Sequence, residues 1–138
     1  MTQVSCKTTI NIPSDVTWQL ISKLGAACQY LAMVVNCTVA GEGVGARRTL
    51  TSADGSTVVE RLDALDEDAH RLSYALLTDT PFGNCLTTVT VRDLSQGQCE
   101  LEWSATFQAA GIPASEAQEM LEGALAANCL ALKQFLER

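Results

Sequence analysis

The sequence has few basic residues, and this shortage excludes one class of partner. Nine Lys and Arg residues stand against 16 Asp and Glu residues, for a net charge of -7, and the largest basic cluster is the pair Arg47-Arg48. A nucleic-acid backbone or an anionic membrane surface would repel such a chain. We therefore expect no nucleic-acid partner.

Histidine is almost absent, which argues against several catalytic and metal sites. His70 is the single histidine, so a Ser-His-Asp relay or a histidine-based zinc site has little support. His70 follows the acidic run Asp66-Glu67-Asp68, which lacks the spacing of a calcium loop, and we expect both to be solvated. The sequence predicts no metal and no cofactor.

The six cysteines occur singly, without any C-x-x-C pair. The N-terminus has no apolar segment typical of a secretion signal, so we expect a reducing, cytoplasmic location. Most of the cysteines are then expected to be small apolar residues of the core. Cys85 has no histidine nearby in the sequence to activate it, which argues against a nucleophilic thiol.

Long apolar runs are also missing, and the longest, near residues 31–35, is far too short for a membrane span. No membrane insertion is expected. With 138 residues, 47% of them hydrophobic and 18% charged, the chain can bury a sizeable core. We predict a single domain over residues 1–138, present as a monomer or weak homodimer.

Periodicity predicts an α+β fold. Seven strands are expected, over residues 4–11, 33–39, 46–52, 57–65, 70–78, 86–92 and 99–107. Alternation is clearest in the last strand, where Leu101, Trp103, Ala105 and Phe107 share one face. Two short helices, over 14–24 and 26–30, follow the first strand, and a long helix begins near residue 115. Ser14 and Ser115 are predicted as N-caps.

A curved antiparallel sheet packed by the long C-terminal helix would bury both apolar surfaces. On one predicted strand, Glu60 shares a face with the apolar residues Val58, Leu62 and Ala64, so an inward Glu60 needs a cation. If the turn 53–56 closes a hairpin, Arg48 lies opposite Glu60. This predicts an internal ion pair, which is either purely structural or a polar anchor for a ligand.

Several aromatic residues are also predicted to face inward. Tyr74 shares a face with Leu72 and Leu76, and is either a core residue or a donor or general acid in a site. Trp103 and Phe107 either line the interior or pack it. Trp18 is expected to hold the first helix against the sheet.

Four strings resemble the START/Bet v 1-like superfamily, and more narrowly its polyketide cyclase/dehydrase and lipid-transport branch. They are V-G-A-R-R-T-L at 44–50, V-V-E-R-L-D-A-L-D at 58–66, R-L-S-Y at 71–74 and L-A-L-K-Q-F-L at the end of the last helix. The resemblance covers almost the whole chain. It implies a helix-grip fold, with a cavity between the sheet and the C-terminal helix.

The string Glu60 to Asp66 also resembles that of plant abscisic-acid receptors. In those proteins its glutamate faces the cavity, and the resemblance places Cys85, Thr87 and Asn128 at polar lining positions. Leu31 stands where the receptors have a lysine for the hormone carboxylate. A hormone-receptor function is therefore not expected.

Two functions remain open from the sequence. The first is binding of a small hydrophobic or aromatic ligand in the internal cavity. The alternative is a cofactor-independent polyketide cyclase or dehydratase that uses Glu60 or Tyr74 as acid or base. A third reading, an interaction protein with a filled core, follows if the interior is closely packed. The candidate ligand-binding residues are Arg48, Leu50, Glu60, Leu62, Tyr74, Leu76, Cys85, Thr87, Val89, Trp103, Phe107, Leu121, Ala124 and Asn128.

Overall fold

The computed structural model describes residues 1–138, and its elements follow the predicted order. They are β1 (Thr2–Ile10), α1 (Ser14–Ser22), the 3-10 helix η1 (Leu24–Gln29), β2 (Val34–Ala40), β3 (Arg47–Ser52), β4 (Thr57–Asp66), β5 (Arg71–Leu76), β6 (Phe82–Ser95), β7 (Gln98–Ala109) and α2 (Ala114–Leu136). The largest difference is in β6, which begins at Phe82 in a segment expected to be a loop. Phe82 pairs there with Ala109 of β7.

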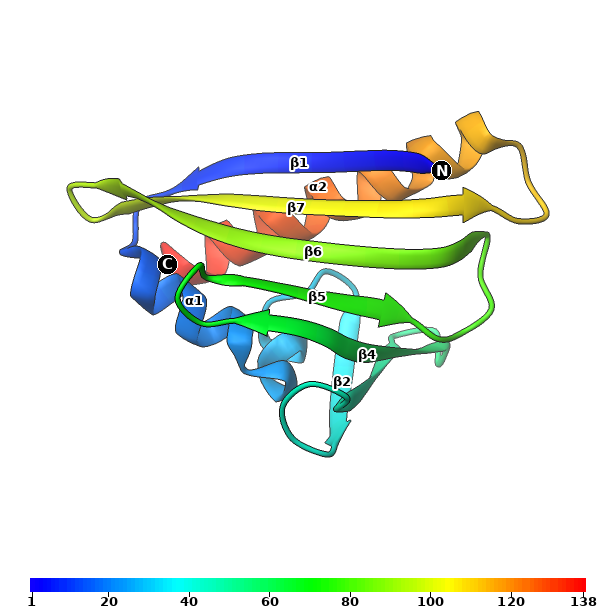
Figure 1. The fold of residues 1–138 in the computed structure, drawn as a ribbon, viewed down its shortest axis with the longest axis horizontal. Coiled ribbons are helices and arrows are strands. Elements are labelled where there is room, and N and C mark those ends of the chain that lie inside the picture. The colour runs from blue at the N-terminus through cyan, green and yellow to red at the C-terminus, as the bar shows by residue number, and fades with distance from the viewer.

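The seven strands form one antiparallel sheet in the order β1-β7-β6-β5-β4-β3-β2. Strands β2 to β7 are neighbours in sequence order, whereas β1 pairs with β7. The segment α1–η1 therefore connects the two edges of the sheet. Figure 1 shows α2 behind the sheet, along β1 and β7. This arrangement confirms the predicted helix-grip fold.

Both α-helices begin after a proline, so the predicted serine caps are wrong. The N-cap positions are Pro13 and Pro113, and neither helix has a side-chain cap. Each proline has extended ψ, and its carbonyl accepts the first helical hydrogen bond at 3.1 Å. Since proline is already restricted to a suitable φ, Ser14 and Ser115 lie inside the first turn.

A β-bulge in β4 reverses the predicted orientation of Ala64. The register with β5 shifts between Leu62 and Ala64, which leaves Asp63 as an extra residue. Ala64 is exposed, and Leu65 packs against the core in its place. Periodicity alone cannot reveal such an insertion.

Helix α1 covers the inner face beneath the β6–β7 hairpin. Its residues Trp18 and Ile21 are buried, and the Thr17 hydroxyl accepts a hydrogen bond from the Cys99 thiol of β7 at 3.4 Å. This half of the interior is a packed core. All six cysteines are free thiols, and Cys85, Cys99 and Cys129 are buried.

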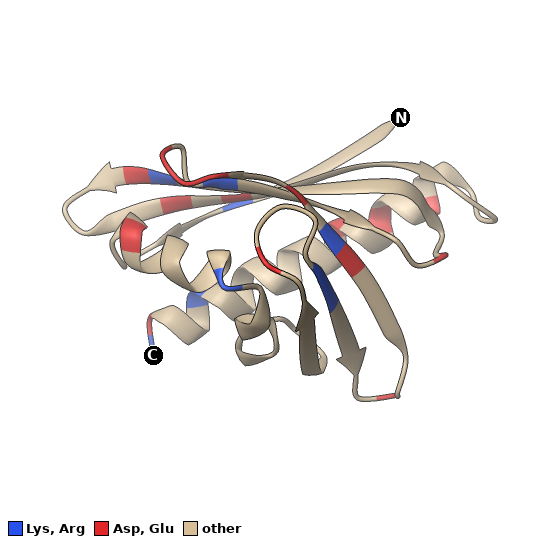
Figure 2. Ribbon diagram, turned by 60° about the horizontal axis from the view of Figure 1, so that its bottom comes forward, with Lys and Arg blue, Asp and Glu red and all other residues tan.

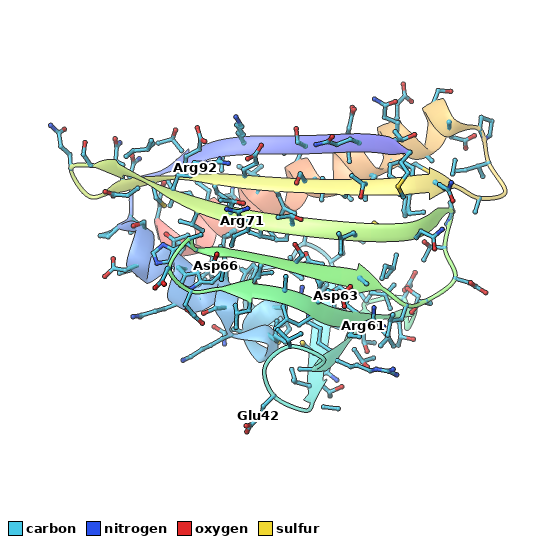
Figure 3. The ribbon with its side chains drawn as sticks, viewed as in Figure 1. Glu42, Arg61, Asp63, Asp66, Arg71 and Arg92 are labelled. Carbon is cyan, nitrogen blue, oxygen red and sulfur yellow. The ribbon has the colours of Figure 1, made fainter.

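The outer face of the sheet carries charged side chains. Figure 2 shows charged positions spread over strands and turns, and Figure 3 places Arg61, Asp63, Arg71 and Arg92 on the face turned away from α2. Arg61 pairs with Asp63 at 2.7 Å. None of the helices is both long and apolar enough to cross a membrane.

Candidate functional site

A cavity of about 260 Å³, partly open to solvent, lies between the sheet, α2 and the segment that follows η1. Of its 17 lining residues, 13 are hydrophobic. Its polar lining residues are Glu60, Thr80, Thr87 and Asn128. Ligand pockets typically measure about 300–1,000 Å³ and have apolar walls with a few polar groups. The cavity has the composition of a small-molecule pocket, with a volume just below this range.

Most of the candidate residues from the sequence line this cavity. They are Leu50, Glu60, Tyr74, Leu76, Cys85, Thr87, Trp103, Leu121, Ala124 and Asn128. Strand alternation brings together the residues of β3 to β7, and helical spacing adds those of α2. Their shared location therefore follows from local periodicity.

The other four candidates lie outside the lining. Leu62 and Val89 belong to the packed core and are 4% and 1% exposed. Phe107 is fully buried and packs edge-on against Phe82, with ring centroids 5.5 Å apart. Arg48 contacts Glu60 and is only 4% exposed. An inward orientation was therefore not enough to place these side chains at the cavity.

Seven further residues line the cavity and were not predicted from the sequence. They are Leu31, Ala32, Val34, Val58, Thr80, Phe82 and Leu125. Val58 and Leu125 follow the same periodicity as their lining neighbours and could have been included. Residues 31–34 and 80–82 have no clear period, so only the tertiary structure places them at the cavity.

Arg48 and Glu60 form the predicted internal ion pair. They are directly opposite each other on β3 and β4, and Arg48 Nε donates a hydrogen bond to Glu60 Oε1 at 2.7 Å. Their side chains are 4% and 13% exposed. Burial lowers the pKa of Arg48, but Glu60 and nearby tyrosines more than offset this, so the pKa is raised. Arg48 therefore stays a cation beside the cavity wall.

Tyr74 lies beside this ion pair and stays protonated. The Arg48 Cζ atom is 4.7 Å from the Tyr74 ring centroid, and Trp103 Nε1 donates a hydrogen bond to the Tyr74 hydroxyl at 3.1 Å. Burial and the charge of Glu60 raise the pKa of Tyr74 well above its usual value. Its hydroxyl can thus accept from Trp103 while keeping its own proton.

Asn128 lies on the opposite wall, on α2. Its Oδ1 accepts a hydrogen bond from the Ala32 backbone N–H at 3.2 Å. This contact orients the side-chain amide and leaves its NH₂ group without a protein acceptor. The cavity therefore has an available donor across from the Glu60 wall.

Cys85 and His70 are poorly suited to catalysis in this cavity. Burial raises the pKa of the Cys85 thiol, so this residue is a poor nucleophile at neutral pH. His70 is half-buried rather than solvated, and it stacks on Trp18 with ring centroids 5.3 Å apart. It lies away from the cavity lining. No group of three or more His, Cys, Asp or Glu side chains is arranged to hold a metal ion.

A family model described as "Polyketide cyclase / dehydrase and lipid transport" matches residues 1–137. The chain belongs to this family. Polyketide cyclase/dehydrase and lipid-transport proteins share the START/Bet v 1 fold, which agrees with the resemblance seen in the sequence. No curated protein matches the chain.

Several solved structures share the fold of this polyketide cyclase/dehydrase family member over nearly its whole length. An uncharacterized protein from Bacillus thuringiensis has a TM-score of 0.92 at 22% identity, with 99% of this chain and 100% of that chain covered. A START superfamily protein from Mycobacterium smegmatis has a TM-score of 0.85 at 12% identity, with 98% and 97% covered. The Zhui aromatase/cyclase from a Streptomyces species has a TM-score of 0.77 at 21% identity, with 98% and 90% covered. At these identities the similarity shows the fold alone.

Proposed function

We propose that the protein binds a small hydrophobic or aromatic molecule in the cavity between the sheet and α2. The observation that carries this proposal is a 260 Å³ space with 13 hydrophobic lining residues. Closely packed interiors have few voids larger than a water molecule. A space of this size beside Glu60, Tyr74 and Asn128 therefore supports an apolar ligand with a polar group.

Native mass spectrometry of the protein purified from its own host tests the proposal. We expect a bound small molecule, and a thermal shift with members of an aromatic and lipid panel. Recovery of no molecule, together with no shift across the panel, would contradict ligand binding.

A cavity-filling variant and a matched control variant test where the ligand binds. Ala124 and Ala126 are both exposed on α2, but only Ala124 lines the cavity. Ala124→Leu should remove the bound molecule and the ligand-induced thermal shift, while Ala126→Leu should keep both. Equal binding by the two variants would place the ligand outside this cavity.

A second candidate function is a cyclase or dehydratase activity, supported by the family description and by Glu60 and Tyr74, which are neighbours in the cavity lining. Glu60 would accept a proton from a methylene between two carbonyl groups of the substrate. The resulting carbanion would attack a ketone, and Tyr74 would donate its proton to the new alkoxide. Return of a proton from Glu60 to Tyr74 and loss of water would complete the reaction.

A poly-β-ketone thioester analogue distinguishes catalysis from binding. An enzyme should convert it to a cyclised product that has lost one water, and Glu60→Gln should reduce the rate strongly. Binding of the analogue without any change in its mass would favour the carrier function.

The cytoplasmic location and the monomeric or weakly dimeric state stay predictions.

A further inference from the structure

The cavity has only one charged residue in its lining, and this limits the ligands that it can accept. Glu60 is this residue, since no Lys, Arg or His lines the space. The neighbouring cation, Arg48, has its charge engaged by Glu60 Oε1 and by the Tyr74 ring, and is 4% exposed. A ligand anion would therefore find a carboxylate and no available cation.

The polar atoms that remain available have a defined pattern. Glu60 Oε2 has no protein hydrogen-bond partner and can only accept while the carboxylate is ionised. The Tyr74 hydroxyl already accepts from Trp103 and has its own proton to donate. Tyr74 is a diagonal neighbour of Glu60 on the same sheet face, since Glu60 pairs with Leu76 and Leu62 pairs with Tyr74. One end of the cavity thus combines an acceptor with a nearby donor.

A hydroxyl group on a ligand matches this pair, because it donates one hydrogen bond and accepts another. An ether can only accept, so it leaves Glu60 Oε2 unsatisfied. A carboxylate also lacks a proton to donate and adds a second negative charge beside Glu60. Burying an unpaired charge or an unsatisfied acceptor is costly.

We propose that the cavity selects uncharged ligands that carry a hydroxyl on an apolar skeleton, with Glu60 accepting from that hydroxyl, and that it discriminates against carboxylates. This inference rests on the proposed ligand-binding function and names the chemical class of the ligand. The Asn128 NH₂ group on the opposite wall is a donor for a second polar atom of the ligand, such as a carbonyl oxygen.

Probes that share a skeleton and differ in one polar group test the inference. The first series is 2-naphthol, 2-methoxynaphthalene and 2-naphthoate. The second is 4-butylphenol, 4-butylanisole and 4-butylbenzoate, which covers a one-ring skeleton. Isothermal titration calorimetry at neutral pH should show the phenol of a series binding about tenfold or more tightly than its ether. The carboxylate should bind most weakly.

The outcomes separate this inference from the proposed function. Binding that Ala124→Leu abolishes, but in which the ether or the carboxylate equals the phenol, supports the cavity and overturns the hydroxyl selectivity. No binding by any probe of either series overturns both the selectivity and the proposed ligand-binding function. Only a phenol preference that Ala124→Leu abolishes supports both.

Variants then test the role of Glu60. Glu60→Gln keeps a hydrogen-bond acceptor but removes the charge, so the ratio of phenol to carboxylate affinity should fall at least about tenfold. A ratio equal to that of the wild type overturns the assignment of Glu60. If Glu60→Gln fails to fold, Arg48→Met/Glu60→Leu removes both charges together and should bind the phenol and the ether equally. A retained phenol preference in the double variant likewise overturns it.

Discussion

At the residue scale, the Arg48–Glu60 pair connects the buried interior with the cavity lining. The two side chains are 4% and 13% exposed and are joined by a 2.7 Å hydrogen bond. A buried charge pair adds little net stability, but each partner depends strongly on the other. Glu60 can therefore stay ionised beside an apolar cavity because Arg48 compensates its charge.

Arg48→Met should destabilise the protein by about 3 kcal/mol, because it leaves the Glu60 carboxylate without its cation. It also removes the contact between the guanidinium and the Tyr74 ring. Urea unfolding at neutral pH measures the change. As a control, Arg48→Met/Glu60→Leu should recover most of the loss. A single variant as stable as the wild type would show that the pair is not coupled to folding.

At the element scale, the β4–β5 turn holds α1 in place. Trp18 of α1 donates a hydrogen bond from Nε1 to Glu67 Oε2 at 2.7 Å, and its ring stacks on His70. The turn that was expected to be simply solvated thus positions α1. This matters for the cavity because α1 fills the neighbouring half of the interior.

Glu67→Ala should lower the free energy of unfolding by about 1 kcal/mol, because the buried Trp18 N–H loses its acceptor. Asp68→Ala is a matched control, since Asp68 is also exposed but makes no side-chain hydrogen bond. Urea unfolding monitored by tryptophan fluorescence compares the two variants. Equal effects would argue against a specific role of the Glu67 contact.

At the scale of the whole molecule, the interior holds several groups that must stay neutral. Burial raises the pKa of Tyr30, Tyr74, Cys85, Cys99 and Cys129. In the unfolded chain the thiols and phenols ionise near their ordinary pKa values of 9.0 and 10.0. The folded state therefore binds more protons than the unfolded state above these values.

The free energy of unfolding should therefore decrease at alkaline pH. The stability that these groups contribute is fully present below about pH 9 and is progressively lost as the pH rises above that value. Urea unfolding at a series of pH values between neutral and strongly alkaline measures the loss. Tyr74→Phe should show a shallower decline above about pH 10. A free energy of unfolding that stays constant through this range would contradict the prediction.

The sequence alone determined the order of the elements, the family, and the pairing of Arg48 with Glu60. These depend on local patterns: strand alternation, a short turn whose length sets the register, and characteristic strings. Most cavity-lining residues of β3 to β7 followed from the same alternation. Local pattern was sufficient there because the period of a strand assigns each side chain to a face.

Only the tertiary structure decided where the cavity ends. Helix α1 packs against β6 and β7, Phe82 instead of Phe107 reaches the lining, and a bulge turns Ala64 outward. The Ala32 N–H, distant in sequence, determines which end of the Asn128 amide is available. These outcomes depend on sheet curvature and on contacts between segments far apart in the chain. Periodicity distinguishes inward from outward side chains. Whether an inward side chain is packed or lines a cavity depends on whether another segment of the chain fills the space in front of it.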